Sequence, residues 1–115
     1  MPEQVAVYDI NGALFFGAAE KAISTLHHVN SNIEVVILDM SDVQMIDITG
    51  IVAFESLLQE LSQQDITVLI TNLQPRMRYK LARAGIETRP GKIEYCNRLQ
   101  DARERALSLL PQELY

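Results

Sequence analysis

The sequence predicts an α/β domain in which a β-hairpin leads into a mixed, mostly parallel sheet with about four helices. Short apolar runs rich in β-branched residues alternate with longer segments whose apolar residues recur at helical spacing. The pair Asn11-Gly12 separates the first two apolar runs, as in a tight hairpin. A strand, a helix and a second strand then fit within residues 35–70, which is long enough for a right-handed βαβ crossover.

The chain begins with two predicted strands and a helix. Residues 5–10 and 13–16 flank Asn11-Gly12, and their β-branched and aromatic side chains favour extended backbone. Gly17 ends the second strand. Apolar residues at positions 19, 22, 23, 26 and 29 then form one stripe, which predicts a helix over residues 18–29.

The middle of the chain predicts a βαβ unit. Residues 35–38 and 66–70 are apolar runs of the kind found in strands that are covered on both faces. Between them, a helix is predicted over residues 49–62. Its apolar stripe is Ile51, Phe54, Leu58 and Leu61.

The last third predicts a helix, a short strand and a final helix. Pro75 suits the first position of a helix, and Gly85 suits the left-handed residue that closes one. Residues 93–96 form the predicted strand. Asn97 with Gln100 resembles a capping box for the final helix. The expected buried stripe of that helix is Leu99, Ala102, Ala106 and Leu109.

Length and composition predict a single domain over residues 1–115. The chain is 48% apolar, and its longest apolar runs are far shorter than the ~20 residues that cross a bilayer. No secretory signal is visible, so we expect the chain to be soluble as it stands, whether whole or part of something larger. Cys96 is the only cysteine, which excludes an internal disulfide. We expect it to be a small buried side chain, with a reactive thiol as the alternative.

Charge is unevenly distributed along the chain. The net charge of −5 argues against nucleic-acid binding, yet nine basic and five acidic residues follow Pro75. Arg76, Lys80 and Arg83 share one face of the predicted helix that begins at Pro75. That face is either a solvated surface balanced by the acidic first half, or a surface for anionic lipid headgroups or an acidic partner.

Motifs of catalysis and cofactor binding are missing from the sequence. Gly12 and Gly17 have P-loop spacing, but no Lys-Ser/Thr pair follows them. His27 and His28 are adjacent and would diverge on a helix, which is a poor arrangement for one metal ion. The methionines at 40, 45 and 77 are expected to fill the core. We therefore expect no catalytic residue, no metal site, no cofactor and no enzyme activity.

One loop has the position of a functional site. Residues 39–51 join the carboxyl end of a predicted buried strand to the amino end of a helix, an edge where α/β sheets usually meet ligands. Unpaired N–H groups and the helix dipole favour an anion at such a helix start. Alternatively, Asp47 or Thr49 only caps the helix.

The same loop carries a family resemblance. Residues 35–43 (VVILDMSDV) and 45–51 (MIDITGI) resemble the signature loop of STAS domains, a family that groups sulfate transporter tails with anti-sigma factor antagonists. The resemblance covers nearly the whole chain and implies the STAS-like, or SpoIIAA-like, fold. It implies that Asp47, Thr49 and Gly50 belong to a signature loop at which an anion, a nucleotide or a partner binds.

Two further segments favour the transporter branch of the family. Residues 11–20 (NGALFFGAAE) are similar to the G-x-L-F-F-x-x-A segment of STAS domains at the carboxyl end of SulP anion transporters. Phe15 and Phe16 either fill the core and an edge or contact a membrane domain or neighbouring subunit. In the antagonists, the residue after the aspartate is a serine that a partner kinase phosphorylates. Ile48 occupies that position here and has no hydroxyl.

The resemblance implies a non-catalytic regulatory or assembly domain of a SulP-type transporter of sulfate or a related anion. Such a domain lies on the cytoplasmic side of the inner membrane as part of a multi-pass protein. Its expected partners are the membrane domain of the same transporter, cytosolic proteins, a weakly bound anion or nucleotide, and further copies through the full transporter. The expected contact residues are Phe15, Phe16, Arg76, Lys80 and Arg83. The alternative is a stand-alone anti-sigma factor antagonist that acts by partner switching.

Overall fold

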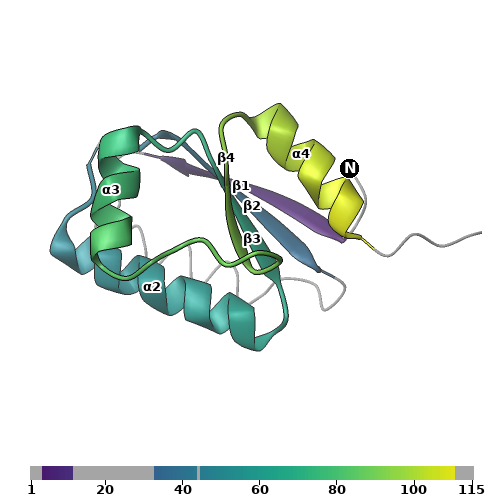
Figure 1. Ribbon diagram of the computed structural model, residues 1–115, viewed down its shortest axis with the longest axis horizontal. Helices are drawn as coiled ribbons and strands as arrows, with labels where there is room; N and C mark the ends of the chain where they lie inside the picture. The colour runs from purple at the N-terminus through teal and green to yellow at the C-terminus, as the bar shows by residue number, and fades with distance from the viewer. Residues whose placement is uncertain (1–3, 12–32, 44, 111–115) are drawn as a thin grey trace, which may run out of the picture.

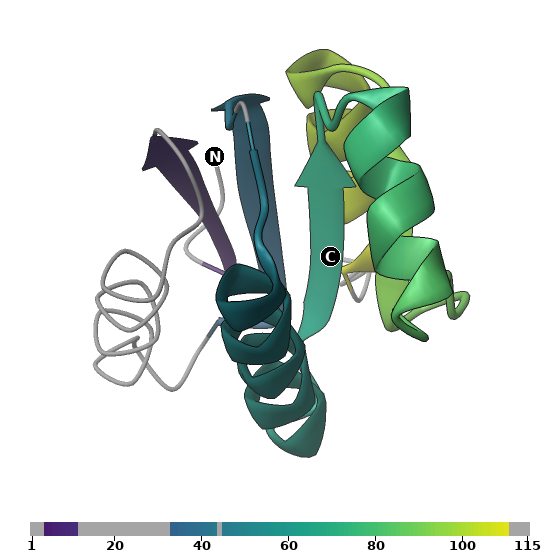
Figure 2. The ribbon, with the colours of Figure 1, turned by 90° about the vertical axis from the view of Figure 1, so that its left-hand side faces the viewer.

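The computed structural model describes residues 4–11, 33–43 and 45–110, which form a four-stranded sheet with helices on both faces (Figure 1). The elements are β1 (Val5–Asn11), β2 (Val35–Asp42), α2 (Ile48–Gln63), β3 (Thr67–Thr71), α3 (Pro75–Arg83), β4 (Ile93–Cys96) and α4 (Leu99–Leu109). The strand order is β1-β2-β3-β4, and all three neighbouring pairs are parallel. Figure 2 shows β1, β2 and β3 side by side in this order.

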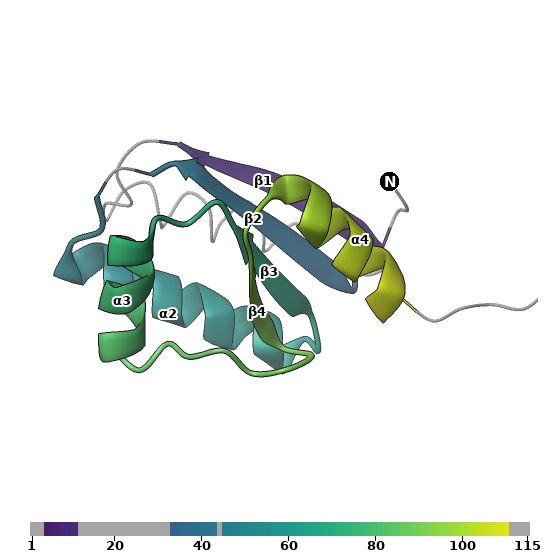
Figure 3. The same ribbon diagram turned by 45° about the horizontal axis from the view of Figure 1, so that its top comes forward.

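Alternating side chains of the strands supply two separate apolar cores. On one face, Val36, Leu38 and Ile70 pack with the buried residues of α2 and α3. On the other face, Ile37 and Leu69 pack with α4. Figures 1 and 3 show α2 and α3 on one side of the sheet and α4 on the other. Coverage on both faces explains why β2 and β3 are apolar along their length rather than alternating.

The helices bury the stripes that the sequence predicts. In α2, Phe54, Leu58 and Leu61 are buried, and Ile51 packs against them from a half-buried position. In α4, Ala102 and Ala106 are fully buried. Their small side chains let the helix backbone approach the sheet closely, so this second core is thin.

Most element boundaries agree with the prediction within one residue. The strand predicted over residues 93–96 matches β4, and α2 gains one residue at each end of its predicted range. The start of α3 at Pro75 and the left-handed Gly85 (φ 92°) after its end are confirmed. β2 extends four residues past the predicted 35–38, because its backbone continues to pair with β1 as far as Asp42.

Two local predictions are wrong. Asn97 does not cap the final helix: the N-cap is Arg98, which makes no side-chain capping bond. Asp101 lies three residues after this cap, near the Nε of Arg98 at 3.5 Å, so a carboxylate already faces the helix start. Met45 does not fill the core and is 52% exposed, because Val43 and Ile46 on either side of it turn inward.

Several predictions fall outside the described residues. The strand at 13–16, the helix at 18–29 and the contact residues Phe15 and Phe16 all lie there. The described ranges contain three helices, against about four predicted for the whole chain. None of the helices in these ranges is both long and apolar enough to cross a bilayer.

Candidate functional site

The carboxyl end of β2 is fixed by the side chain of Asp39. Its Oδ1 accepts hydrogen bonds from the backbone N–H of Ser41 and from the Nδ2 of Asn72, each at 3.1 Å. Partial burial would raise the pKa of Asp39, but the bonds from Asn72 and Ser41 outweigh it and hold that pKa below its usual value. Asp39 therefore joins the ends of β2 and β3, and its charge serves the local structure.

Asp47 is the N-cap of α2. Its backbone is extended, and its Oδ1 accepts a hydrogen bond from the N–H of Gly50 at 2.7 Å. The N–H of Ile51 bonds to the carbonyl oxygen of Asp47 at 2.9 Å and begins the helical pattern. This geometry realises the capping alternative of the sequence analysis. The Asp47 carboxylate therefore occupies the Gly50 N–H, one of the backbone donors that an anion bound at the helix start would need.

The other predicted residues of the signature loop have different environments. Gly50 is buried, and its N–H is occupied by Asp47. Thr49 is exposed and presents its hydroxyl at the first turn of α2. Ile48 is the first residue of the helix and is 81% exposed.

The predicted basic face of α3 divides among three environments. Lys80 donates a hydrogen bond from its Nζ to the carbonyl oxygen of Ile46 at 2.9 Å, which joins α3 to the signature loop. Arg83 lies over the ring of Tyr79, 5.8 Å from its centroid, and donates from Nη1 to the Tyr79 hydroxyl at 3.3 Å. Arg76 is exposed. Lys80 thus has a structural role in addition to its charge.

An exposed apolar patch at the start of α2 was not foreseen from the sequence. Met45, Ile48 and Val52 are exposed by 52%, 81% and 60%, and we call these three residues the α2-start patch. Ile48 and Val52 are one helical turn apart and therefore neighbours on the helix surface. Val52 is an apolar residue of α2 that lies off the buried stripe of Phe54, Leu58 and Leu61. This helical position could have indicated its exposure from the sequence alone.

Cys96 has the environment of an unreactive thiol. It is partly buried at the end of β4. Burial, followed by the carboxylates of Glu94 and Asp101, raises the pKa of the Cys96 thiol. A raised pKa leaves little thiolate at neutral pH, which disfavours the alternative of a reactive cysteine.

Comparisons with known proteins agree with the family resemblance and the fold. The family model described as the STAS domain matches residues 2–102. Sulfate transporter 2.2 of Arabidopsis thaliana is 42% identical over 57 residues, which are 50% of this chain and 8% of that protein. The chain thus spans a small part of that curated relative.

Solved structures match over nearly the whole chain. A sulfate transporter family protein from Wolinella succinogenes has a TM-score of 0.83 at 26% identity, over 95% of this chain and 89% of that one. A SulP transporter STAS domain from Vibrio cholerae has a TM-score of 0.80 at 31% identity, over 94% and 84%. The anti-sigma factor antagonist SpoIIAA shares the fold, with a TM-score of 0.70 at 16% identity over 93% of each chain.

Proposed function

The chain belongs to the STAS domain family, and from this premise we propose that it is the cytoplasmic STAS domain of a SulP-type transporter of sulfate or a related anion. Residues 1–115 then form one domain of a longer polypeptide at the inner face of the membrane. The proposal is supported by the 26% and 31% identity to the two transporter-family structures, against 16% to the antagonist.

The observation that carries the proposal is Ile48. The family resemblance places at this position the serine that the antagonists present to a kinase. The side chain here is 81% exposed, but it is a hydrocarbon with no atom that accepts a phosphoryl group. An accessible apolar side chain suits a lasting contact with another protein surface better than a reversible modification.

We infer a non-catalytic role in which the α2-start patch contacts the membrane domain of the same transporter. Two carboxylates of the signature loop support this role, because Asp39 and Asp47 are bonded to groups that hold the loop together. Lys80 and the carbonyl oxygen of Ile46 keep α3 in place behind the loop. Such a contact would position the domain, and copies of it would meet through the full transporter.

Uptake of labelled sulfate by the full-length transporter in cells tests this role. We expect Ile48→Asp and Val52→Asp each to reduce uptake severalfold, because a carboxylate in an apolar contact loses its hydration. Leu107→Asp is the matched control. Leu107 is also apolar and 47% exposed, but it lies on α4, on the other face of the sheet. Equal uptake by all three variants, at equal amounts in the membrane, would refute the contact.

Incubation of the purified chain with an anti-sigma kinase and ATP tests the alternative function. We expect no phosphate at position 48, because Ile48 has no hydroxyl. Stoichiometric phosphorylation of Thr49, the exposed hydroxyl next to it, would favour a stand-alone antagonist that acts by partner switching. Sequencing the gene upstream of the Met1 codon gives a second answer. The transporter predicts several apolar segments of ~20 residues there.

A further inference from the structure

A cavity lies at the outer side of β4, and none of its lining residues belongs to the signature loop. Its volume is about 190 Å³, and it has contributions from α3, the connection before β4, β4 itself and α4. Its lining residues are Arg78, Thr88, Pro90, Glu94, Tyr95 and Arg105. Two guanidinium groups and one carboxylate thus line a small space in a chain whose net charge is −5.

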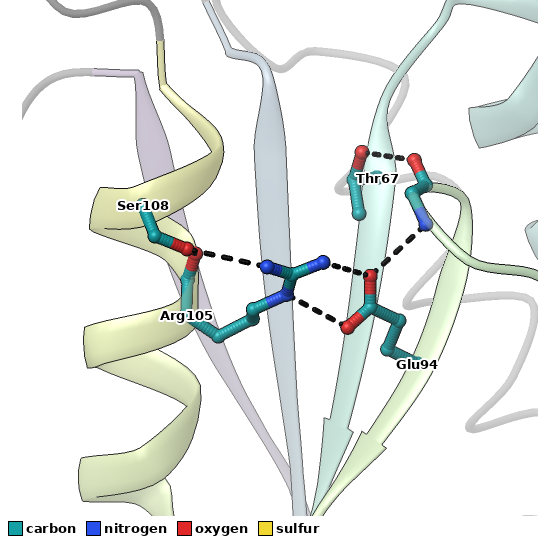
Figure 4. A network of polar contacts seen from close by, with 5 residues as sticks. Thr67, Glu94, Arg105 and Ser108 are labelled. Carbon is teal, nitrogen blue, oxygen red and sulfur yellow. Dashed lines mark hydrogen bonds and ion pairs between the residues drawn. The ribbon is translucent and has the colours of Figure 1, made fainter.

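The carboxylate in this cavity, Glu94, is ionised and forms an ion pair with Arg105. Arg105 donates from Nε and Nη2 to the two oxygens of Glu94 at 2.9 and 3.0 Å (Figure 4). Glu94 also accepts a hydrogen bond from the N–H of Gly91 at 3.0 Å, and Arg105 donates to the hydroxyl of Ser108 at 3.4 Å. The bonds from Arg105 lower the pKa of Glu94, so its charge persists and balances that of Arg105.

The second guanidinium is held in place without being neutralised. The Cζ of Arg78 lies 4.5 Å from the ring centroid of Tyr95. Tyr95 is half-buried, and its hydroxyl donates to the carbonyl oxygen of Ile86 at 3.5 Å, which fixes the ring. Stacking on an aromatic face orients a guanidinium but uses none of its N–H donors. Within the described ranges, Arg78 has no carboxylate partner.

We propose that this cavity binds a small tetrahedral oxyanion, phosphate or sulfate, with Arg78 as its main ligand. The planar fork of N–H donors in Arg78 matches the spacing of two oxyanion oxygens. Because Arg105 compensates the charge of Glu94, that carboxylate does not leave the cavity net negative, and the exposed hydroxyl of Thr88 is a second donor. The site follows from these residues alone and does not depend on the function proposed above.

Titration of the isotopically labelled chain with sodium phosphate, followed by two-dimensional NMR, tests the site. We expect saturable shifts of the Arg78 Nε–H and of the amides of Thr88 and Tyr95. Sodium sulfate should produce them as well, whereas sodium chloride at the same ionic strength should not. Glycerol 3-phosphate is titrated separately, and its affinity relative to phosphate shows whether the ligand is a free ion or a phosphomonoester.

Two substitutions on α3 separate the site from general electrostatics. Arg78→Gln should weaken phosphate binding by about tenfold or more, since it removes charged hydrogen bonds. Arg76→Gln removes the same charge from an exposed position of the same helix that does not line the cavity. It should bind phosphate like the wild type. Unchanged melting temperatures of both variants confirm that the fold is intact.

Three outcomes would overturn the proposal. The first is that chloride shifts the same resonances to the same extent as phosphate. The second is that Arg78→Gln and Arg76→Gln weaken binding equally, because the effect would then be one of net charge. The third is that neither phosphate, sulfate nor glycerol 3-phosphate causes saturable shifts.

Discussion

Removal of the Asp47 carboxylate is the sharpest test of the signature loop. Asp47→Ala deletes the acceptor of the 2.7 Å bond from Gly50 and leaves a buried residue with an unpaired N–H. Loss of an N-cap costs about 0.5–2 kcal/mol, and the exposure of Asp47 itself favours a value of about 1 kcal/mol. In a domain of this size, that loss lowers the melting temperature by roughly 3–6 °C.

Thermal and urea unfolding of three variants measure this cost. Asp47→Asn should lose less free energy of unfolding than Asp47→Ala, because an asparagine oxygen accepts the same bond. Glu87→Ala is the control, since it removes one carboxylate from an exposed position outside the helices. If Asp47→Ala unfolds like the wild type, Asp47 does not act as the cap. A loss equal to that of Glu87→Ala would attribute the effect to net charge.

The remaining predictions concern other parts of the fold. A double-mutant cycle in urea with Glu94→Gln and Arg105→Gln should give a favourable coupling free energy. Because bonds from Arg105 lower the pKa of Glu94, this stabilisation is present above the ordinary pKa of 4.5 and is lost as pH falls through the folded pKa. Acid should therefore lower the free energy of unfolding of the wild type more than that of Glu94→Gln. An equal loss in both proteins would contradict a lowered pKa of Glu94 in the folded state. Thr71→Val should raise the free energy of unfolding by about 1 kcal/mol, since the buried Thr71 hydroxyl has no partner in the described residues. A lower free energy of unfolding, measured by calorimetry, would show that the hydroxyl of Thr71 is hydrogen-bonded. Gly85→Ala should lower the melting temperature at a cost of about 1 kcal/mol, because φ is 92° there, and an unchanged melting temperature would refute this.

The core of the fold could be predicted because its signals are local and periodic. The apolar runs of β2 and β3 and the stripe from Phe54 to Leu61 report burial directly. Pro75 and Gly85 act through backbone torsion angles that only those residues favour. Where two signals compete the prediction fails, as at Asn97, whose capping pattern with Gln100 is displaced by a helix that begins one residue later.

The contacts of the candidate site were less accessible to sequence reasoning. Asp47 follows the local spacing of a cap and was predictable, but Lys80 meets Ile46 across 34 positions. The stacking of Arg78 on Tyr95 likewise joins two elements whose relative placement only the fold determines. Helical spacing predicts that Arg76, Lys80 and Arg83 share one face of α3, yet it gives no information on which of them has a hydrogen-bond partner.

One substitution at Ile48, the first residue of α2, can separate its effect on the stability of the domain from its role in the proposed contact with the membrane domain. No residue of the first turn of Ile48–Gln63 is acidic, although a carboxylate there interacts favourably with the helix dipole. Ile48→Glu should therefore stabilise the isolated chain by about 0.3–1 kcal/mol, since an 81% exposed isoleucine contributes little packing. In the full-length transporter, the same variant should reduce sulfate uptake, because the new charge faces an apolar contact. A stabilised chain with normal uptake would remove Ile48 from the proposed contact, whereas a destabilised chain would show that its side chain packs within the domain.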